Sequence, residues 1–434
     1  MATTPTQITD AGGPGSGIGA GTTPLGAVLA LTFLGSLGTG AVTNGFSFIA
    51  TQGLGYARTM NLLLALVLGV SYIAGALASG PIVRRLSERG AGRGSALSPR
   101  GVLVLVLVVI GLACQFPIAA KHFAPGLMEV SLWALIIVFS PMTGILWPIV
   151  EGYLSGGRRD RALRAALGRF NIVWSSALVL SFWAMAPLLE HQPFLILSLL
   201  GCFQFAMIGL LVWFPSYPPR HVDGHGGSAP ASYRPLLTIF RVLLIASYIV
   251  LSALSPLLPI VEDRLGVDVA WKTPIASVWL FSRVFMFLLF ERWHGWHGRW
   301  WTPWTGMALM IVGFAGCVGS PVFEGVGLWV LVGGLVVVGM GIAMTYYGAL
   351  YYAMALGNAE VDAGGKHEAM IGVGYTLGPI CGLGGVGLSG GDDDAFRLWV
   401  IALITACVVG AVGLGWHLLR RDRRRLPPVA PSPH

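Results

Sequence analysis

The scarcity of charge constrains this chain more than any other feature. Charged residues make up 11% of the sequence, against roughly 25% in soluble domains. They leave twelve segments of low charge, and only the eighth is interrupted, by Arg283. Because ~20 apolar residues span the ~30 Å hydrocarbon core of a bilayer, each segment is long enough to cross it once. The segments are 11–57, 59–83, 101–120, 130–150, 170–189, 191–219, 242–261, 273–290, 300–323, 325–359, 369–391 and 398–419. Since helices satisfy their own backbone hydrogen bonds in lipid, the sequence predicts an all-α polytopic membrane protein with twelve transmembrane helices.

The basic residues alternate between the two sides of such a bundle. With alternating loops, one side receives only five of the 27 Lys and Arg residues, and these are Arg58, Lys121, Arg264, Lys272 and Arg397. The other loops and the chain ends receive all the rest except Arg283. Because the basic side of a membrane protein is normally cytoplasmic, both termini are predicted to be cytoplasmic, in a plasma (cell inner) membrane. The net charge of +8 then reflects membrane topology and does not indicate nucleic acid.

The longest polar loop divides the chain near its middle. Residues 24–214 are predicted to form one six-helix half, and residues 235–419 form the other, joined by a cytoplasmic linker at 215–234. Residues 1–23 are rich in Gly, Thr and Pro without Lys or Arg, and are predicted to be a disordered cytoplasmic segment. Residues 420–434 form a basic tail suited to anionic headgroups.

Two six-helix halves joined in this way, with both ends inside, resemble the major facilitator superfamily (MFS) of secondary transporters. The loop after the second helix reads Gly-Pro-Ile-Val-Arg-Arg-Leu-Ser-Glu-Arg-Gly at 80–90. It has the leading glycine and the basic cluster of the family's signature, with Arg84 where that signature has Asp. The same residues also fit an ordinary basic inside loop. The resemblance implies two pseudo-symmetric halves that rock around a central site.

Helix eleven carries the spacing of an antiporter motif that the family places on the symmetry-related helix five, with a leucine in place of its last glycine. Glycines four residues apart predict a smooth stripe for close helix contact, and the proline predicts a bend. We interpret the motif as a helix-packing and gating element and not as a sign of antiport. Its residues are Gly365, Gly374, Gly378, Pro379 and Gly382.

Arg283 is the foremost candidate for substrate binding. It lies near the middle of the eighth segment, where an arginine costs at least ~2.5–3.5 kcal/mol on insertion scales. A guanidinium at that depth is suited to an anionic substrate held by forked hydrogen bonds. The alternative is a structural arginine that binds backbone carbonyls or tyrosines.

Tyr347 and Tyr351 share one face of helix ten and suit a substrate cavity of mixed polarity, although an interfacial belt explains them equally. Five further polar residues are weaker candidates for substrate binding, because each also fits an interhelical hydrogen bond: Asn44, Asn171, Trp174, Gln204 and Tyr248.

Three titratable residues near the cytoplasmic ends of helices are candidates for proton coupling: Glu151, His367 and Glu368. A buried carboxyl favours its neutral form and so carries a proton, whereas a pairing with loop arginines such as Arg158 or Arg169 is the alternative. His294 and His297 lie among tryptophans, which indicates an interfacial turn and not a metal site.

The favoured function is secondary active transport of a small polar or anionic organic solute by alternating access. The expected partners are that solute, a coupling proton or ion, and the bilayer. A transporter-like scaffold or sensor is the alternative, followed by a membrane-embedded enzyme, for which no catalytic constellation is evident. We expect a monomer with no cofactor, metal or nucleic acid.

Overall fold

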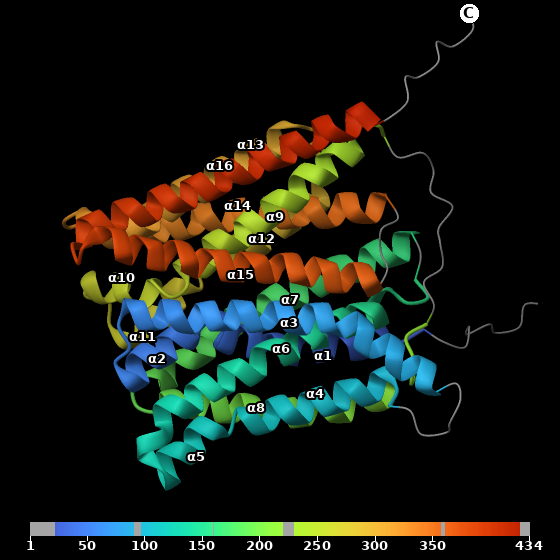
Figure 1. The fold of residues 1–434 in the computed structure, drawn as a ribbon, viewed down its shortest axis with the longest axis horizontal. Helices are drawn as coiled ribbons and strands as arrows, with labels where there is room; N and C mark the ends of the chain where they lie inside the picture. The colour runs from blue at the N-terminus through green and yellow to red at the C-terminus, as the bar shows by residue number, and fades with distance from the viewer. Residues whose placement is uncertain (1–21, 91–96, 159, 220–229, 357–360, 426–434) are drawn as a thin grey trace, which may run out of the picture.

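The computed structural model describes residues 22–90, 97–158, 160–219, 230–356 and 361–425. Most of the predicted disordered segment (1–23), half of the linker (220–229) and the end of the basic tail (426–434) lie outside the described residues. Figure 1 shows the rest as a bundle of long helices lying side by side. The described helices include 12 that are long and apolar enough to cross a membrane, so the predicted all-α fold with twelve spans is confirmed.

The first six spans form what we call the first half. Within it α1 packs on α7 and α8, α3 packs on α6, and α4 packs on both α6 and α8. Its helices are α1 (Leu25–Gly38), η1 (Thr39–Asn44), α2 (Phe46–Leu54), α3 (Arg58–Gly90), α4 (Pro99–Ala113), α5 (Phe116–Phe123), η2 (Pro125–Leu127), α6 (Met128–Ser155), α7 (Asp160–Leu189), α8 (Pro193–Leu210) and η3 (Leu211–Trp213).

The last six spans form the second half. There α14 packs on α12 and α13, and α9 packs on α14, α15 and α16. Its helices are α9 (Tyr233–Leu254), α10 (Leu258–Arg264), α11 (Val269–Ala276), α12 (Val278–Arg292), α13 (Trp301–Gly319), η4 (Ser320–Val322), α14 (Gly327–Ala355), α15 (Val361–Ser389) and α16 (Asp393–Arg425). That the two halves superpose about an axis along the membrane normal stays a prediction.

The halves meet along two seams. One joins α3 and α6 to α15, and the other joins α7 to α11 and α12. At the first seam the helices approach so closely that a Cβ placed on Gly69 would lie 2.5 Å from the backbone carbonyl carbon of Tyr375. Only a residue without a side chain allows that approach, because backbone atoms cannot move aside.

The glycines of α15 do not share one partner, unlike the single stripe that their spacing predicts. A Cβ on Gly374 would meet Tyr248 of α9 at 2.4 Å, and a Cβ on Gly378 would meet the backbone oxygen of Ile249 on α9, also at 2.4 Å. A Cβ on Gly382 would instead meet Leu62 of α3 at 2.4 Å. Positions four apart rotate about 40° around a helix, so the stripe drifts from the neighbour within the half to the neighbour across the seam.

The eighth span is two helices, where the sequence predicts one from 273 to 290. It breaks at Ser277, between α11 and α12. Pro274 lies within the last turn of α11, which ends at Ala276, and a proline removes a backbone donor from the helix. The Ser277 hydroxyl donates to the carbonyl of Pro274 at 2.6 Å and accepts a hydrogen bond from the indole of Trp183 on α7 at 3.1 Å. The break is therefore tied to the other half.

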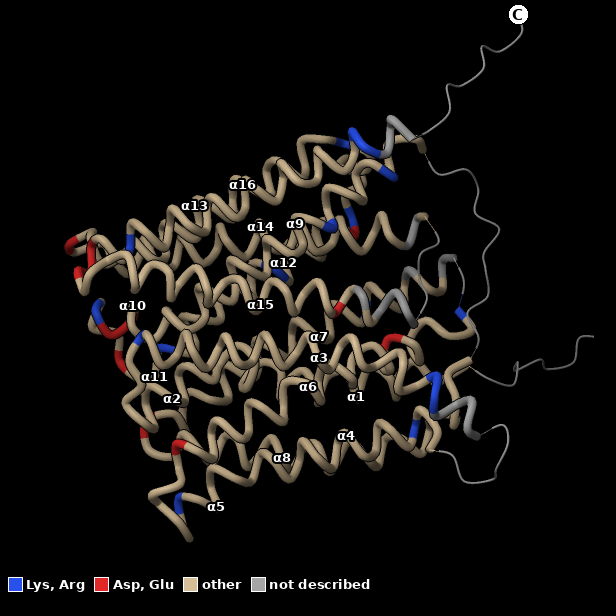
Figure 2. Tube along the Cα trace, viewed as in Figure 1, with Lys and Arg blue, Asp and Glu red and all other residues tan. Residues whose placement is uncertain are grey.

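Charge separates the two ends of the bundle. Figure 2 shows acidic residues gathered at the end that carries α5, α10 and α11, with many of the basic residues at the opposite end. We call these the acidic face and the basic face. At the acidic face Asp393 of the second half accepts from Arg58 of the first half at 3.1 Å and also pairs with Arg264. The two halves are thus joined there by a shared carboxylate.

A second carboxyl near the acidic face is fully buried. Glu262 of α10 is 0% exposed, and neither of its oxygens has a hydrogen-bond partner in the described part of the chain. Burial raises the pKa of the Glu262 carboxyl well above its usual range, and Asp263 raises it further, while Lys272 opposes both effects. The neutral acid is therefore the form that the fold favours.

We expect Glu262→Gln to raise the melting temperature of the purified protein at pH 8 by at least about 2 °C. Folding raises the pKa of the Glu262 carboxyl. The folded protein therefore loses stability as pH rises above the pKa of this carboxyl in the unfolded chain, because only the unfolded chain then releases the proton. The gain should therefore shrink toward pH 4. Glu324→Gln, at an exposed carboxyl in the loop after η4, is the matched control and should change little. An equal gain at both pH values would contradict the titration argument.

Candidate functional site

Arg283 lies in a cage of aromatic rings between the two halves. The side chain is 1% exposed. Its guanidinium carbon lies 4.2 Å from the ring centroid of Trp174 on α7 and 4.8 Å from that of Tyr346 on α14. Phe287, one turn along α12, is 5.3 Å away. The rings of Trp174 and Tyr346 are themselves stacked, at 5.9 Å and 17°. Residues from both halves therefore hold the charge.

The cage leaves hydrogen-bonding capacity unused. Within the described residues, Nε and Nη2 of Arg283 have no acceptor. The Tyr248 hydroxyl of α9 lies within hydrogen-bonding reach of the guanidinium. Each cation–π contact stabilises the guanidinium by roughly 0.5–2 kcal/mol. A buried N–H donor that is left without an acceptor costs roughly 1–3 kcal/mol, and more when the donor group is charged. Two N–H donors of the buried Arg283 guanidinium are therefore left without an acceptor in the described chain.

A chain of tyrosines leads from Arg283 to a buried carboxyl. The ring of Tyr248 lies 5.2 Å from that of Tyr375 on α15, which lies 5.5 Å from the ring of Tyr72 on α3. The Tyr72 hydroxyl donates a short hydrogen bond to Oε2 of Glu368. We call Arg283, Tyr248, Tyr375, Tyr72 and Glu368 the central network. It crosses the first seam, so its continuity depends on how the halves are arranged.

The other two candidates for proton coupling lie beside this network. Glu151 at the end of α6 interacts electrostatically with Glu368 and with Tyr248. The ring of His367 lies 6.4 Å from that of Tyr346, which also contacts Arg283. The structure thus brings together residues that the sequence places only at separate helix ends.

A cavity of about 570 Å³ lies between the halves on the side of the basic face. Tyr347 and Tyr351 line it from α14, and Asn171 lines it from α7, one turn from Trp174. Both polar atoms of the buried Asn171 amide have no partner in the described chain. The lining of the cavity also includes Ala165, Gly168, Phe290, Glu291, His294, His297 and Leu350. The cavity thus reaches to within one helical turn of the aromatic cage.

The turn after α12 differs from the interfacial turn that the sequence predicts. Trp293 and Trp301 are exposed, but Trp296 is 0% exposed and stacks on Phe290 at 4.9 Å. His297 stacks on Tyr351 at 4.2 Å, and its Nδ1 lies 3.2 Å from the Tyr351 hydroxyl. Burial, with a contribution from His294, lowers the pKa of His297, which favours the neutral form of this side chain.

Two of the weaker candidates lie away from Arg283. Gln204 is buried against α1, where its Nε2 would be 3.1 Å from a Cβ on Gly38, inside the first half. The Asn44 amide donates to the carbonyl of Thr39 at 3.2 Å within the π-helical turn η1. It borders a void of only about 10 Å³ that Tyr375 also lines. The Oε1 atom of Gln204 has no partner in the described chain, so a role for either residue in substrate binding stays a prediction.

Tyr72, Tyr375 and Tyr346 are parts of the site that the sequence did not single out. Tyrosines away from helix ends are the only signal that could have identified them, because their partners lie on other helices. Among the described residues no group of three His, Cys, Asp or Glu side chains could hold a metal ion.

The fold resembles that of several solved transporters. The nucleoside transporter NupG aligns over 92% of this chain and 99% of its own, with a TM-score of 0.61 and 13% identity. A bacterial homologue of the human lysosomal transporter Spinster, in an inward-facing and occupied conformation, covers 93% and 98%, with a TM-score of 0.63 and 14% identity. The human organic anion transporter MFSD10 covers 91% and 98%, with a TM-score of 0.57 and 14% identity. No protein-family model and no curated protein sequence matches the chain.

Proposed function

We propose that this chain, which has the fold of the major facilitator superfamily, is a secondary active transporter of a small organic anion. The observation that carries the proposal is the buried, incompletely paired guanidinium of Arg283 between the halves. A carboxylate or phosphate would supply the missing acceptors for Nε and Nη2. The remaining groups of the solute would contact the aromatic rings around Arg283 and the Asn171 amide.

The two faces support alternating access. The acidic face is closed by the carboxylate of Asp393 shared between the halves, whereas the basic face has the cavity of about 570 Å³. We propose that the basic face is cytoplasmic, as the loop charges predict, in the plasma membrane. The described conformation is then inward-facing. A solute released from Arg283 would pass Phe290 and Tyr347 to reach the cytoplasm.

The test is transport by the purified chain in proteoliposomes. A panel of radiolabelled carboxylates and organic phosphates should yield at least one solute that exchanges across the membrane, and uncharged analogues of that solute should not. Binding of the same solute without any transport would instead favour a sensor, and failure of every anion while a neutral solute is carried would overturn the proposed substrate class.

We further propose that Glu368 carries a coupling proton. Its carboxylate accepts from Tyr72 and interacts with Glu151, so protonation would change the central network that includes Arg283. We expect Glu368→Gln to abolish stimulation of uptake by an inwardly directed proton gradient while solute exchange continues. Tyr72→Phe, which removes only the hydrogen bond, should shift the pH dependence and keep the stimulation. Gradient-driven uptake that is unchanged in Glu368→Gln would contradict this role.

A further inference from the structure

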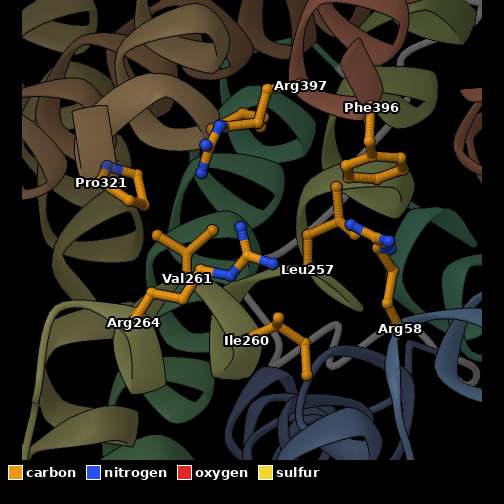
Figure 3. A pocket seen from close by; sticks show the side chains of 9 residues that line it. Arg58, Leu257, Ile260, Val261, Arg264, Pro321, Phe396 and Arg397 are labelled. Atoms are coloured by element: carbon orange, nitrogen blue, oxygen red, sulfur yellow. The ribbon is translucent and has the colours of Figure 1, made fainter. Parts of the chain in front are cut away.

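The acidic face holds a second concentration of positive charge, away from the central network. Arg58 begins α3 in the first half, Arg264 ends α10, and Arg397 lies in the first turns of α16. We call these three residues the outer arginine cluster. All three line one pocket, shown in Figure 3, where the guanidiniums of Arg264 and Arg397 point toward each other and that of Arg58 lies by Phe396.

Carboxylates balance this cluster incompletely. Asp393 pairs with both Arg58 and Arg264, and Asp394 pairs with Arg397. Asp392, the third carboxylate of this acidic run, accepts from the backbone of Ala395. The Nε atoms of Arg58 and Arg397 are also buried with no acceptor in the described part of the chain. Two buried N–H donors therefore lack an acceptor, which is the arrangement that favours a bound anion.

The size and walls of the pocket limit what it can hold. Its free volume is about 20 Å³, slightly more than the ~10–15 Å³ that one water needs. Apart from the three arginines its lining is apolar: Leu257, Ile260, Val261, Val318, Pro321 and Phe396. Apolar walls strengthen the attraction between an ion and the guanidiniums. The pocket thus fits one monatomic anion and excludes an organic solute.

We propose that the outer arginine cluster binds a small inorganic anion such as chloride, which stabilises the closed acidic face. The cluster joins Arg58 of the first half to two arginines of the second half, so separation of the halves at this face would disperse it. An anion that binds only the assembled cluster therefore favours the conformation described here. This inference does not require that Arg283 bind substrate.

The test is thermal unfolding of the purified full chain in detergent, titrated with sodium chloride against sodium gluconate at constant ionic strength. We expect the melting temperature to rise with chloride and to saturate. Arg397→Gln should raise the half-saturating chloride concentration at least tenfold. Asp394→Asn, which removes a competing carboxylate, should lower it. Arg292→Gln, at an exposed arginine that ends α12 on the basic face, is the control and should keep the wild-type response.

The response should also persist in Arg283→Gln, which separates this site from the substrate site. Absence of any chloride response in the wild-type protein, or an unchanged response in Arg397→Gln, would overturn the proposal. Crystals grown in bromide give an independent measurement that needs no variant. An anomalous peak among the three guanidiniums is expected, and saturating bromide without such a peak would likewise overturn it.

Discussion

Arg283→Gln is expected to abolish binding of the transported anion, and Arg283→Lys to weaken it at least a hundredfold. A lysine keeps the charge but cannot reproduce two parallel hydrogen bonds to one anionic group, and a glutamine has no charge. An ammonium is also more strongly hydrated than a guanidinium, so its place among Trp174, Tyr346 and Phe287 is less favourable. The measurement is equilibrium binding of the solute identified in the proteoliposome screen.

Folding must be separated from binding in this experiment. Removal of a charge from the membrane interior lowers the insertion cost, so Arg283→Gln should be produced and should melt at or above the wild-type temperature. Trp174→Phe, which keeps a ring over the guanidinium position, should lower affinity only several-fold. If Arg283→Gln binds the anion with near-normal affinity, the arginine is a structural residue of the aromatic cage.

Gly69→Ala is expected to reduce transport at least tenfold with both halves still folded. The added Cβ would lie 2.5–2.6 Å from three backbone atoms of Tyr375 and Thr376. Because those atoms belong to α15 in the other half, the substitution pushes the halves apart at the first seam. It also displaces Tyr375, which links Tyr72 to Tyr248. The measurement is the initial rate of solute exchange, corrected for the amount of protein inserted.

Two other glycines provide controls for that substitution. Gly333 of α14 has open space where a Cβ would lie, so Gly333→Ala should leave transport unchanged. A Cβ on Gly378 would lie 2.1 Å from the Ser252 hydroxyl and 2.4 Å from the carbonyl of Ile249, both within the second half. Gly378→Ala should therefore lower the yield of folded protein. Gly69→Ala transporting as fast as wild type would show that the first seam tolerates separation.

The fold could be predicted from sequence because its main determinant is one-dimensional. The spacing of charged residues defines twelve segments independently of how they pack, and the described residues contain twelve helices that are long and apolar enough to cross a membrane. Arg283 could be singled out for the same reason, since a charge inside an apolar segment is visible without a structure. Its role in substrate binding stays a prediction.

The rest of the candidate site depends on contacts between distant segments. Glu368 and Glu151 could be assigned only to helix ends, yet Glu368 accepts from Tyr72, 296 residues away in the chain. The partners of Tyr375 come from α3 and α9, which no local pattern reveals. Asn44 shows the opposite limit. The sequence could not show that its amide donates to the carbonyl of Thr39 in its own distorted helix, and its role in substrate binding stays a prediction.

The break at Ser277 divides the eighth span into two helical segments, α11 and α12. The α11 arm carries Lys272, which pairs with Asp263 at 2.5 Å at the acidic face, and the α12 arm carries Arg283. The indole of Trp183 holds the joint itself against the first half. Bending at this pivot would swing the outer arm without displacing the guanidinium. We therefore expect the acidic end of the eighth span to be able to shift while Arg283 keeps its position on α12.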